Sequence, residues 1–264
     1  MASDDDESIV ASAPLHADES SNVPETPKRP GHMAVFRGFH RSIVGKVVTS
    51  REMEPGPVEQ YRRLAATLHH SQVERGTKKV MVASAVDGEG KTLTALNLAL
   101  TLSESYHRRV VLIDADLRCP RIHEMLDIAN VAGLNEALKN PRQSKATLLS
   151  VSSRLSVLPA GRPNPDPMGP LTSRRMAQIL DKAAAHFDWV IVDTPPVVLL
   201  PDTNLLAAMV DVAVLVVQAG STSYDLIDRA IAALGRDRVL GVVLNGVEET
   251  DREYEPTTYL AHRY

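Results

Sequence analysis

The chain has 264 residues, of which 44% are hydrophobic and 23% are charged. These values are typical of globular proteins and exclude collagen-like, coiled-coil and wholly disordered chains. The single cysteine excludes a disulfide framework and predicts a reducing compartment. The net charge of −4 gives no electrostatic basis for nucleic-acid binding, and no apolar run approaches the roughly 18 residues of a membrane span. We therefore expect a soluble protein that is not exported.

The N-terminal region divides into an acidic and a basic segment. Residues 1–32 hold seven acids and two bases, contain four prolines and have few large apolar side chains, which predicts a disordered acidic arm. Residues 28–51 contain six bases and no acid, interleaved with apolar residues. We therefore interpret residues 33–57 either as a linker that packs a few side chains on the domain or as a docking segment for peripheral contact with anionic lipid or a membrane partner.

The remainder of the sequence alternates strands and helices, the pattern of parallel strands joined by crossover helices. The expected helices cover residues 59–69, 91–103, 174–185 and 226–234. The expected strands are short, β-branched and apolar on both faces, and cover residues 79–83, 110–113, 155–158, 189–192, 213–217 and 240–244. This pattern predicts a single α/β domain over residues 58–246, with a doubly wound, mostly parallel sheet and helices on both faces.

A glycine-rich turn follows the first expected strand directly, with the sequence AVDGEGKT over residues 85–92. Its strand–loop–helix context is that of a phosphate-binding loop, although Ala85 replaces the usual first glycine. Lys91 would place its charge on the β- and γ-phosphates, and the hydroxyl of Thr92 would bind Mg²⁺. Nucleotide contacts are predicted for Asp87, Gly88, Glu89, Gly90, Lys91, Thr92 and Leu93.

Three aspartates end two other expected strands, at the edge of the sheet where parallel strands place their ligands. Asp114 and Asp116 follow one strand and point to the same face if the extended geometry continues. Asp193 follows another strand and is the carboxylate expected either to bind Mg²⁺ directly or to support its ligands from outside. A lone aspartate at such a place is often a helix cap, but three of them beside a phosphate loop favour metal or base roles.

Four sequence blocks, VMVASAVDGEGKT, LIDADLRCPRIHEML, GLNEAL and FDWVIVDTPP, resemble the bacterial tyrosine kinases of the capsular polysaccharide type (BY-kinases), over about residues 58–244. The resemblance implies a P-loop NTPase fold and an ATP- and Mg²⁺-dependent tyrosine autokinase. It implies that Asp114 accepts the tyrosine proton, that Asp116 holds Mg²⁺ with Thr92, and that Asp193 completes the metal shell. Asn245 matches the position that reads adenine in related ATPases, or is a strand-end turn residue.

Three of the six tyrosines, Tyr254, Tyr259 and Tyr264, fall in the last eleven residues, among acidic residues. We expect residues 247–264 to form a flexible tail. Such a segment is either an ordinary frayed terminus or a functional one. The resemblance implies that these tyrosines are the autophosphorylation sites.

The resemblance also bears on partners and location. It implies regulation of exopolysaccharide or capsule synthesis and export through a membrane-embedded polysaccharide co-polymerase that activates the chain at the cytoplasmic face of the membrane. Family members carry an E-x-x-R-x-x-R motif used in ring formation, which here reads Glu59, Arg62 and Ala65. Because the last arginine is missing, self-association stays open, and Glu59 and Arg62 are alternatively a surface ion pair.

Two other functions are compatible with this sequence. The first is a partitioning or cell-division ATPase of the ParA or MinD type, which hydrolyses ATP with water; Val86 replaces the lysine usual in that class. The second is a non-catalytic, nucleotide-binding regulator of polysaccharide export.

Overall fold

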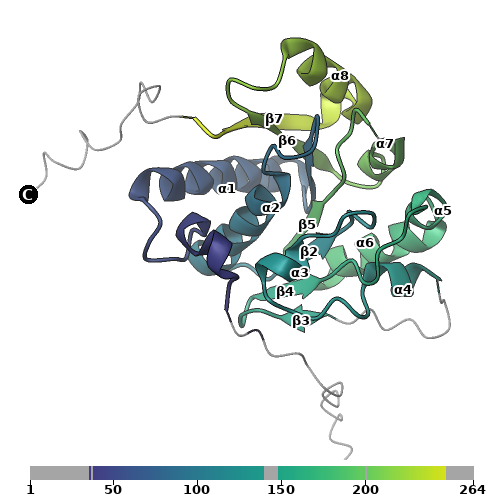
Figure 1. Cartoon of the computed structure of the whole chain (residues 1–264), viewed down its shortest axis with the longest axis horizontal. Helices are drawn as coiled ribbons and strands as arrows, with labels where there is room; N and C mark the ends of the chain where they lie inside the picture. Colours follow the sequence, from purple (N-terminus) through teal and green to yellow (C-terminus); the bar gives the residue numbers. More distant parts are fainter. Residues whose placement is uncertain (1–35, 37, 140–147, 200, 248–264) are drawn as a thin grey trace, which may run out of the picture. The chain divides into compact units, whose positions relative to one another are not determined.

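The computed structural model describes residues 36, 38–139, 148–199 and 201–247 (Figure 1). The acidic arm over residues 1–32 and the tail tyrosines Tyr254, Tyr259 and Tyr264 lie outside the described residues.

A mixed sheet forms the centre of the described chain, with strand order β3-β4-β2-β5-β1-β6-β7. All neighbouring strands are parallel except β3, which is antiparallel to β4. The strands are β1 (Lys79–Ser84), β2 (Val110–Asp114), β3 (Leu149–Ser150), β4 (Leu155–Leu158), β5 (Trp189–Asp193), β6 (Val212–Gln218) and β7 (Val239–Asn245). All six expected strands are confirmed to within one residue at either end, and β3 was not anticipated, because two residues are too few to show a period.

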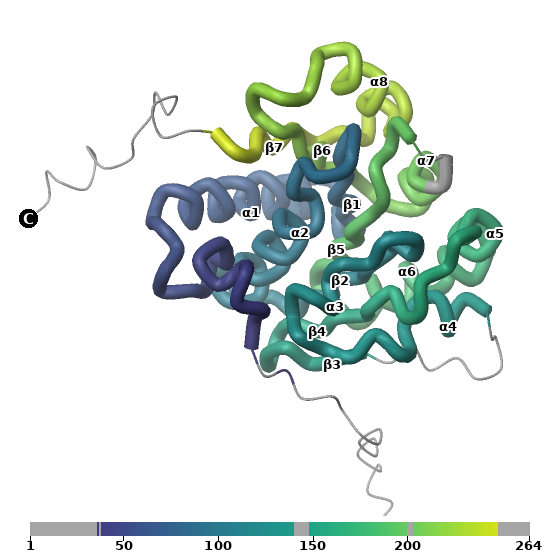
Figure 2. Tube along the Cα trace, viewed as in Figure 1, coloured from purple at the N-terminus to yellow at the C-terminus, as the bar shows by residue number. Residues whose placement is uncertain are grey.

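Helices cover both faces of the sheet, as predicted (Figure 2). One face packs against η1 (Arg41–Lys46), α1 (Pro55–Arg75), α2 (Lys91–Leu100) and α3 (Ile122–Met125). The other packs against α4 (Leu134–Lys139), α5 (Met168–Leu171), α6 (Arg174–His186), α7 (Pro201–Ala207) and α8 (Tyr224–Leu234). Successive residues of β2 alternate between the two hydrophobic clusters, since strand side chains point to opposite faces in turn.

Two predicted helix ranges differ from the structure by more than two residues at an end. The helix predicted over residues 59–69 is longer, because Pro55 occupies the first helical position and Gly76 ends the helix in the left-handed conformation, with φ of 71°. The helix predicted over residues 91–103 ends as an α-helix at Leu100 and continues as the π-helical turn η2 (Thr101–Ser105). A short 3-10 turn, η3 (Arg236–Arg238), precedes β7.

Part of the basic segment packs on the domain. Ile43 and Val47 are buried in the cluster that contains α2. The Asn97 side chain of α2 donates to the carbonyl of Lys46 over 2.8 Å and accepts from the N–H of Val48 over 3.0 Å. Of the helices that the structure describes, none is both long and apolar enough to cross a membrane.

Candidate functional site

The site lies at the carboxyl ends of β1, β5 and β2, which are neighbours in the sheet. The register pairs Asp114 of β2 with Asp193 of β5. The glycine-rich loop leaves the end of β1, and α2 begins at Lys91, so the backbone N–H groups of its first turn are located at the same edge. The structure therefore brings together the loop and the two strand ends, which are distant in the sequence.

Two glycines of the loop have left-handed backbone conformations, Gly88 with φ of 85° and Gly90 with φ of 89°. A Cβ atom on Gly90 would lie 2.2 Å from Nδ2 of Asn245, whereas one on Gly88 would meet nothing within 4 Å. Glycine is thus required at position 90 both for its conformation and for its contact with β7. Such a turn allows successive N–H groups to surround an anion.

Glu89 has a structural role that the sequence did not indicate. Its side chain is only 2% exposed, and its Oε2 accepts the N–H of Val86 over 2.8 Å. Its Oε1 accepts the hydroxyl of Thr222 and the N–H of Gln218, the latter over 3.3 Å. These bonds attach the loop to the end of β6, so only the backbone of Glu89 is left for contact with a nucleotide.

Lys91 is at the centre of the charged groups. Its Nζ lies 3.3 Å from Oδ2 of Asp116 and 4.0 Å from Oδ1 of Asp87. Burial lowers the pKa of Lys91, but attraction by Asp193, Asp116 and Asp87 outweighs burial and raises the pKa above its ordinary value. Lys91 is therefore a permanent cation at neutral pH, as phosphate binding requires.

Asp193 is fully buried, and neither of its carboxylate oxygens has a hydrogen bond of normal geometry among the described residues. Burial raises the pKa of Asp193 to about 7, although the charge of Lys91, the nearby hydroxyl of Thr92 and the N–H of Thr194 oppose the rise. Buried carboxylate oxygens are normally paired. A buried carboxylate without hydrogen-bond partners, close to a phosphate loop, has free oxygen atoms that fit a role as a cation ligand.

Asp114 and Asp116 are both buried but have different partners. Asp114 is fully buried and accepts the N–H groups of Asp116 and Ile122, both over 3.2 Å. Its burial raises its pKa well above the ordinary value, with Asp193 adding to the rise. Asp116 is 5% exposed, and its Oδ1 accepts the N–H of Cys119 over 3.0 Å. Asp114 thus holds the backbone after β2 in place, whereas Asp116 faces Lys91.

The donors at this edge fit Mg²⁺ better than a metal held by protein ligands alone. No group of three or more histidine, cysteine, aspartate or glutamate side chains is close enough to hold a metal ion in the described ranges. Mg²⁺ is usually held by one or two carboxylates, with phosphate oxygens and waters completing the octahedron. Thr92, at 6% exposure, and the unpaired Asp193 supply such a partial set.

Comparisons with known proteins agree with this geometry. A family model described as "ParA: NUBPL iron-transfer P-loop NTPase" matches residues 75–253. The chain is 37% identical over 217 residues to the tyrosine-protein kinase YwqD of Bacillus subtilis, covering 81% of this chain and 91% of that protein. The chain belongs to the bacterial tyrosine-kinase family. The BY-kinase resemblance and the P-loop NTPase fold are thereby confirmed.

Two further members place the chain within this family. It is 24% identical over 260 residues to the tyrosine-protein kinase wzc of Salmonella typhi; the alignment covers 97% of this chain but only 35% of that protein. The structure of the kinase domain of the Escherichia coli tyrosine kinase ETK aligns with a TM-score of 0.70 and 26% identity, covering 84% of this chain and 94% of that domain. The chain thus corresponds to about a third of the Salmonella relative.

Asn245, matched above to related ATPases, and the three positions of the ring motif have defined surroundings in the structure. Asn245 donates from Nδ2 to the carbonyl of Glu89 over 2.9 Å, so it holds the phosphate loop as well as ending β7. Glu59 and Arg62 form the surface ion pair, at 3.5 Å, with both side chains about half exposed. Ala65, the third position of the ring motif, is fully buried in the core.

Proposed function

We propose that this chain is an ATP-dependent protein-tyrosine autokinase whose acceptors are its own C-terminal tyrosines. The observation that carries the proposal is the site at the carboxyl edge, where Lys91 lies 3.3 Å from Asp116 and the unpaired Asp193 is buried beside Thr92. Membership of the tyrosine-kinase family supports the same reaction.

The reaction depends mainly on positioning and charge, as in other phosphoryl transfers. The N–H groups of residues 87–93 hold the phosphates, and Lys91 exchanges its contact with Asp116 for the β- and γ-phosphates. Thr92, Asp116 and Asp193 would hold Mg²⁺, which supplies positive charge to the transferring phosphoryl group. That charge also favours the ionised form of Asp193, whose pKa is about 7 without it.

Asp114 is proposed as the base, but it is fully buried and its pKa is raised, so it must first lose its own proton. Comparing Asp114→Asn with Asp116→Asn tests the assignment. The two aspartates are two residues apart in the sequence, but only Asp116 contacts Lys91. If Asp114 is the base, Asp114→Asn abolishes the pH dependence of turnover on its acidic limb. A normal rate and pH profile in Asp114→Asn would reject the base role and leave Asp114 as the residue that positions Asp116.

The acceptor sites are tested by mass spectrometry after incubation with ATP and Mg²⁺. Phosphate is expected on Tyr254, Tyr259 and Tyr264, and the triple change of these residues to Phe removes it. Tyr224→Phe is the matched control, because Tyr224 is 88% exposed and lies away from the tail in the sequence. Phosphate on Tyr224 alone would contradict the acceptor assignment.

A ParA-type ATPase is the second candidate, because the matching family model carries that name. The two functions differ in the acceptor of the phosphoryl group, tyrosine or water. Measuring phosphotyrosine and free phosphate in the same reaction separates them. Steady release of phosphate without phosphotyrosine would replace the kinase proposal with the ATPase.

We further propose a membrane-embedded polysaccharide co-polymerase as the activator, and through it a role in exopolysaccharide or capsule synthesis and export at the cytoplasmic face of the membrane. Self-association is proposed as the route by which a tail reaches a neighbouring site. Adding the membrane partner should raise autophosphorylation, and light scattering during the reaction should detect the assembly. An autokinase rate that is unchanged by the partner would reject this mode of activation.

A further inference from the structure

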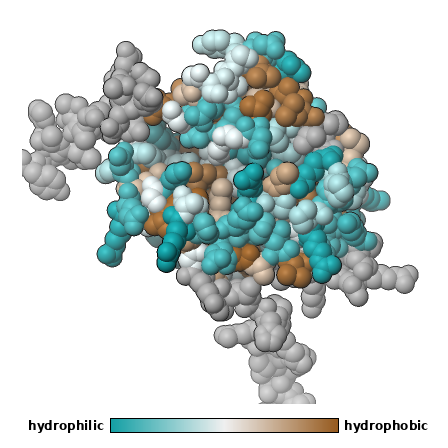
Figure 3. Space-filling view, in the orientation of Figure 1, coloured by the Kyte–Doolittle hydropathy of each residue, from teal (hydrophilic) through white to brown (hydrophobic). Residues whose placement is uncertain are grey.

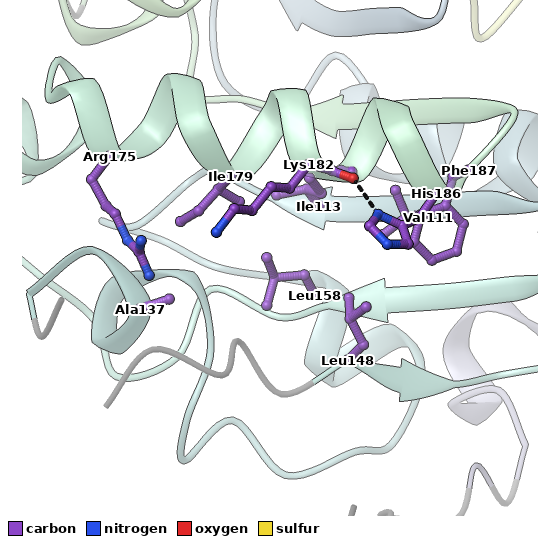
Figure 4. A pocket seen from close by; sticks show the side chains of 11 residues that line it. Val111, Ile113, Ala137, Leu148, Leu158, Arg175, Ile179, Lys182, His186 and Phe187 are labelled. Atoms are coloured by element: carbon purple, nitrogen blue, oxygen red, sulfur yellow. Dashed lines mark hydrogen bonds between the residues drawn. The ribbon is translucent and has the colours of Figure 1, made fainter. Parts of the chain in front are cut away.

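A cavity of about 390 Å³ lies between α6 and the sheet, on the face opposite α2 (Figure 4). Its sheet side is formed by Val111 and Ile113 of β2 and Leu158 of β4. Ile179 and Phe187 line it as well. The volume falls within the range of about 300–1,000 Å³ that is typical of small-molecule sites.

Three bases lie around this apolar cavity, all from α6. Arg175, Lys182 and His186 line it with Ile179. Their spacing of seven and four residues places them on one face of the helix. Figure 4 shows the Arg175 and Lys182 side chains extending from α6 over the cavity, while His186 bonds through Nδ1 to the carbonyl of Lys182 over 2.8 Å.

The positive charge at the cavity is not neutralised by the part of the protein that the structure describes. None of the described lining residues is acidic. Arg175 and Lys182 form no ion pair with a described carboxylate, and Nε of Arg175 is shielded from solvent without a hydrogen-bond partner. A buried guanidinium nitrogen without a partner is costly, and an anion would satisfy it.

We propose that this cavity binds a fatty-acyl carboxylate. The unbranched hydrocarbon chain lies along β2 and β4, in contact with Ile113 and Leu158, and the carboxylate bonds to Arg175 and Lys182. Only an amphipathic anion matches both an apolar interior and a basic margin. This site is separate from the phosphate loop and does not depend on the proposed kinase activity.

Isothermal titration of the full-length chain with sodium decanoate tests the proposal. Saturable binding with one site per chain is expected. Arg175→Gln should weaken it about tenfold, which corresponds to 1.4 kcal/mol. Arg174→Gln is the matched control, because Arg174 is the exposed neighbour on the same helix, carries the same charge and does not line the cavity. Lys182→Gln, at an exposed position, provides a second variant if Arg175→Gln does not fold.

Two control ligands distinguish binding of the hydrocarbon chain from binding of the negatively charged head group. Decanol should bind more weakly than decanoate, and decyltrimethylammonium should not compete with it. Ala183→Leu, which fills the cavity from α6, should abolish binding while circular dichroism stays unchanged. The proposal is overturned if decanoate does not bind, if the cationic amphiphile binds as well, or if Arg174→Gln and Arg175→Gln weaken binding equally. It is also overturned if Arg175 is needed for binding to phosphatidylglycerol vesicles but not for free decanoate.

Discussion

Two aspartates at opposite ends of β5 differ in their exposure, in their hydrogen bonding and in the direction of their pKa shift. Asp188 precedes the strand, is one-third exposed, and accepts bonds from the Arg109 backbone N–H over 2.9 Å and its guanidinium over 3.0 Å. Those hydrogen bonds hold the pKa of Asp188 below its ordinary value, against partial burial. Asp193 ends the strand, fully buried and unpaired among the described residues, with its pKa raised to about 7 by that burial.

The same contrast extends along the edges of the sheet. At the amino end, Asp211 accepts the N–H groups of Lys78 and Lys79, each over 2.8 Å, so the charges there are used to hold strands together. At the carboxyl edge the acids face one another and Lys91. The charged groups at the amino edge therefore stabilise the fold through hydrogen bonds to the backbone. The acids and Lys91 at the carboxyl edge form a cluster that a bound ligand would stabilise.

The largest effect is expected from Lys91→Met at the carboxyl edge. Loss of the cation should lower autophosphorylation by about 10²–10³-fold, the usual cost of one electrostatic stabiliser of a transition state. Phosphotyrosine formed per minute measures it. Lys139→Met, which removes an exposed lysine at the end of α4, should leave the rate unchanged. A rate within a few-fold of the parent in Lys91→Met would remove Lys91 from the mechanism.

Asp193→Asn should stabilise the nucleotide-free protein at high pH. From about pH 4 to pH 7 the folded chain keeps a proton on Asp193 that the unfolded chain releases, so the free energy of unfolding falls as pH rises through this window. Removing the group should therefore add a few kcal/mol at pH 8 and little at pH 4. Urea unfolding in the presence of EDTA measures this. An equal effect at both pH values would contradict the raised pKa.

Comparing Gly90→Ala with Gly88→Ala should distinguish the cost of backbone strain from the cost of a steric clash with Asn245. Both positions have left-handed φ values, which cost about 1–2 kcal/mol for a residue with a Cβ. Only Gly90→Ala adds a clash with Asn245, so it should lower the unfolding midpoint further. In an Asn245→Ala background, which removes both the clash and the hydrogen bond of Asn245 to Glu89, Gly90→Ala should lower the midpoint only as much as Gly88→Ala does. If the two single variants have the same midpoint, the contact between the loop and β7 has no energetic weight.

The smallest effect is expected at the amino edge. Asp188→Asn should lower the free energy of unfolding by about 1 kcal/mol at pH 7, because the N–H of Arg109 loses its charged acceptor. Since the pKa of Asp188 is depressed, the stabilisation is present above the ordinary aspartate pKa and is lost as pH falls below it. The difference between parent and variant should therefore shrink near pH 3. If Asp188→Asn instead raised the free energy of unfolding, Asp188 would not stabilise the fold and would not differ from Asp193 in this respect.

Much of the fold could be read from local patterns. Continuous β-branched runs identified six strands, because strands buried between two helix layers are apolar on both faces. The short α3, α4 and α5 helices and β3 could not be found, since four to six residues span little more than one helical turn and two residues show no period. The π-helical turn after Leu100 carries no composition signal that distinguishes it from a continued α-helix.

The sequence alone determined the identity of the chemical groups: a glycine loop followed by Lys91 and Thr92, and aspartates directly after two strands. These follow from local order along the chain, because a loop and a strand end are defined by neighbouring residues. Tertiary structure alone decided which acid is unpaired, that Glu89 and Asn245 hold the loop, and that the bases of α6 surround a cavity. Such properties depend on burial and on partners more than a hundred residues away, and no local pattern records them.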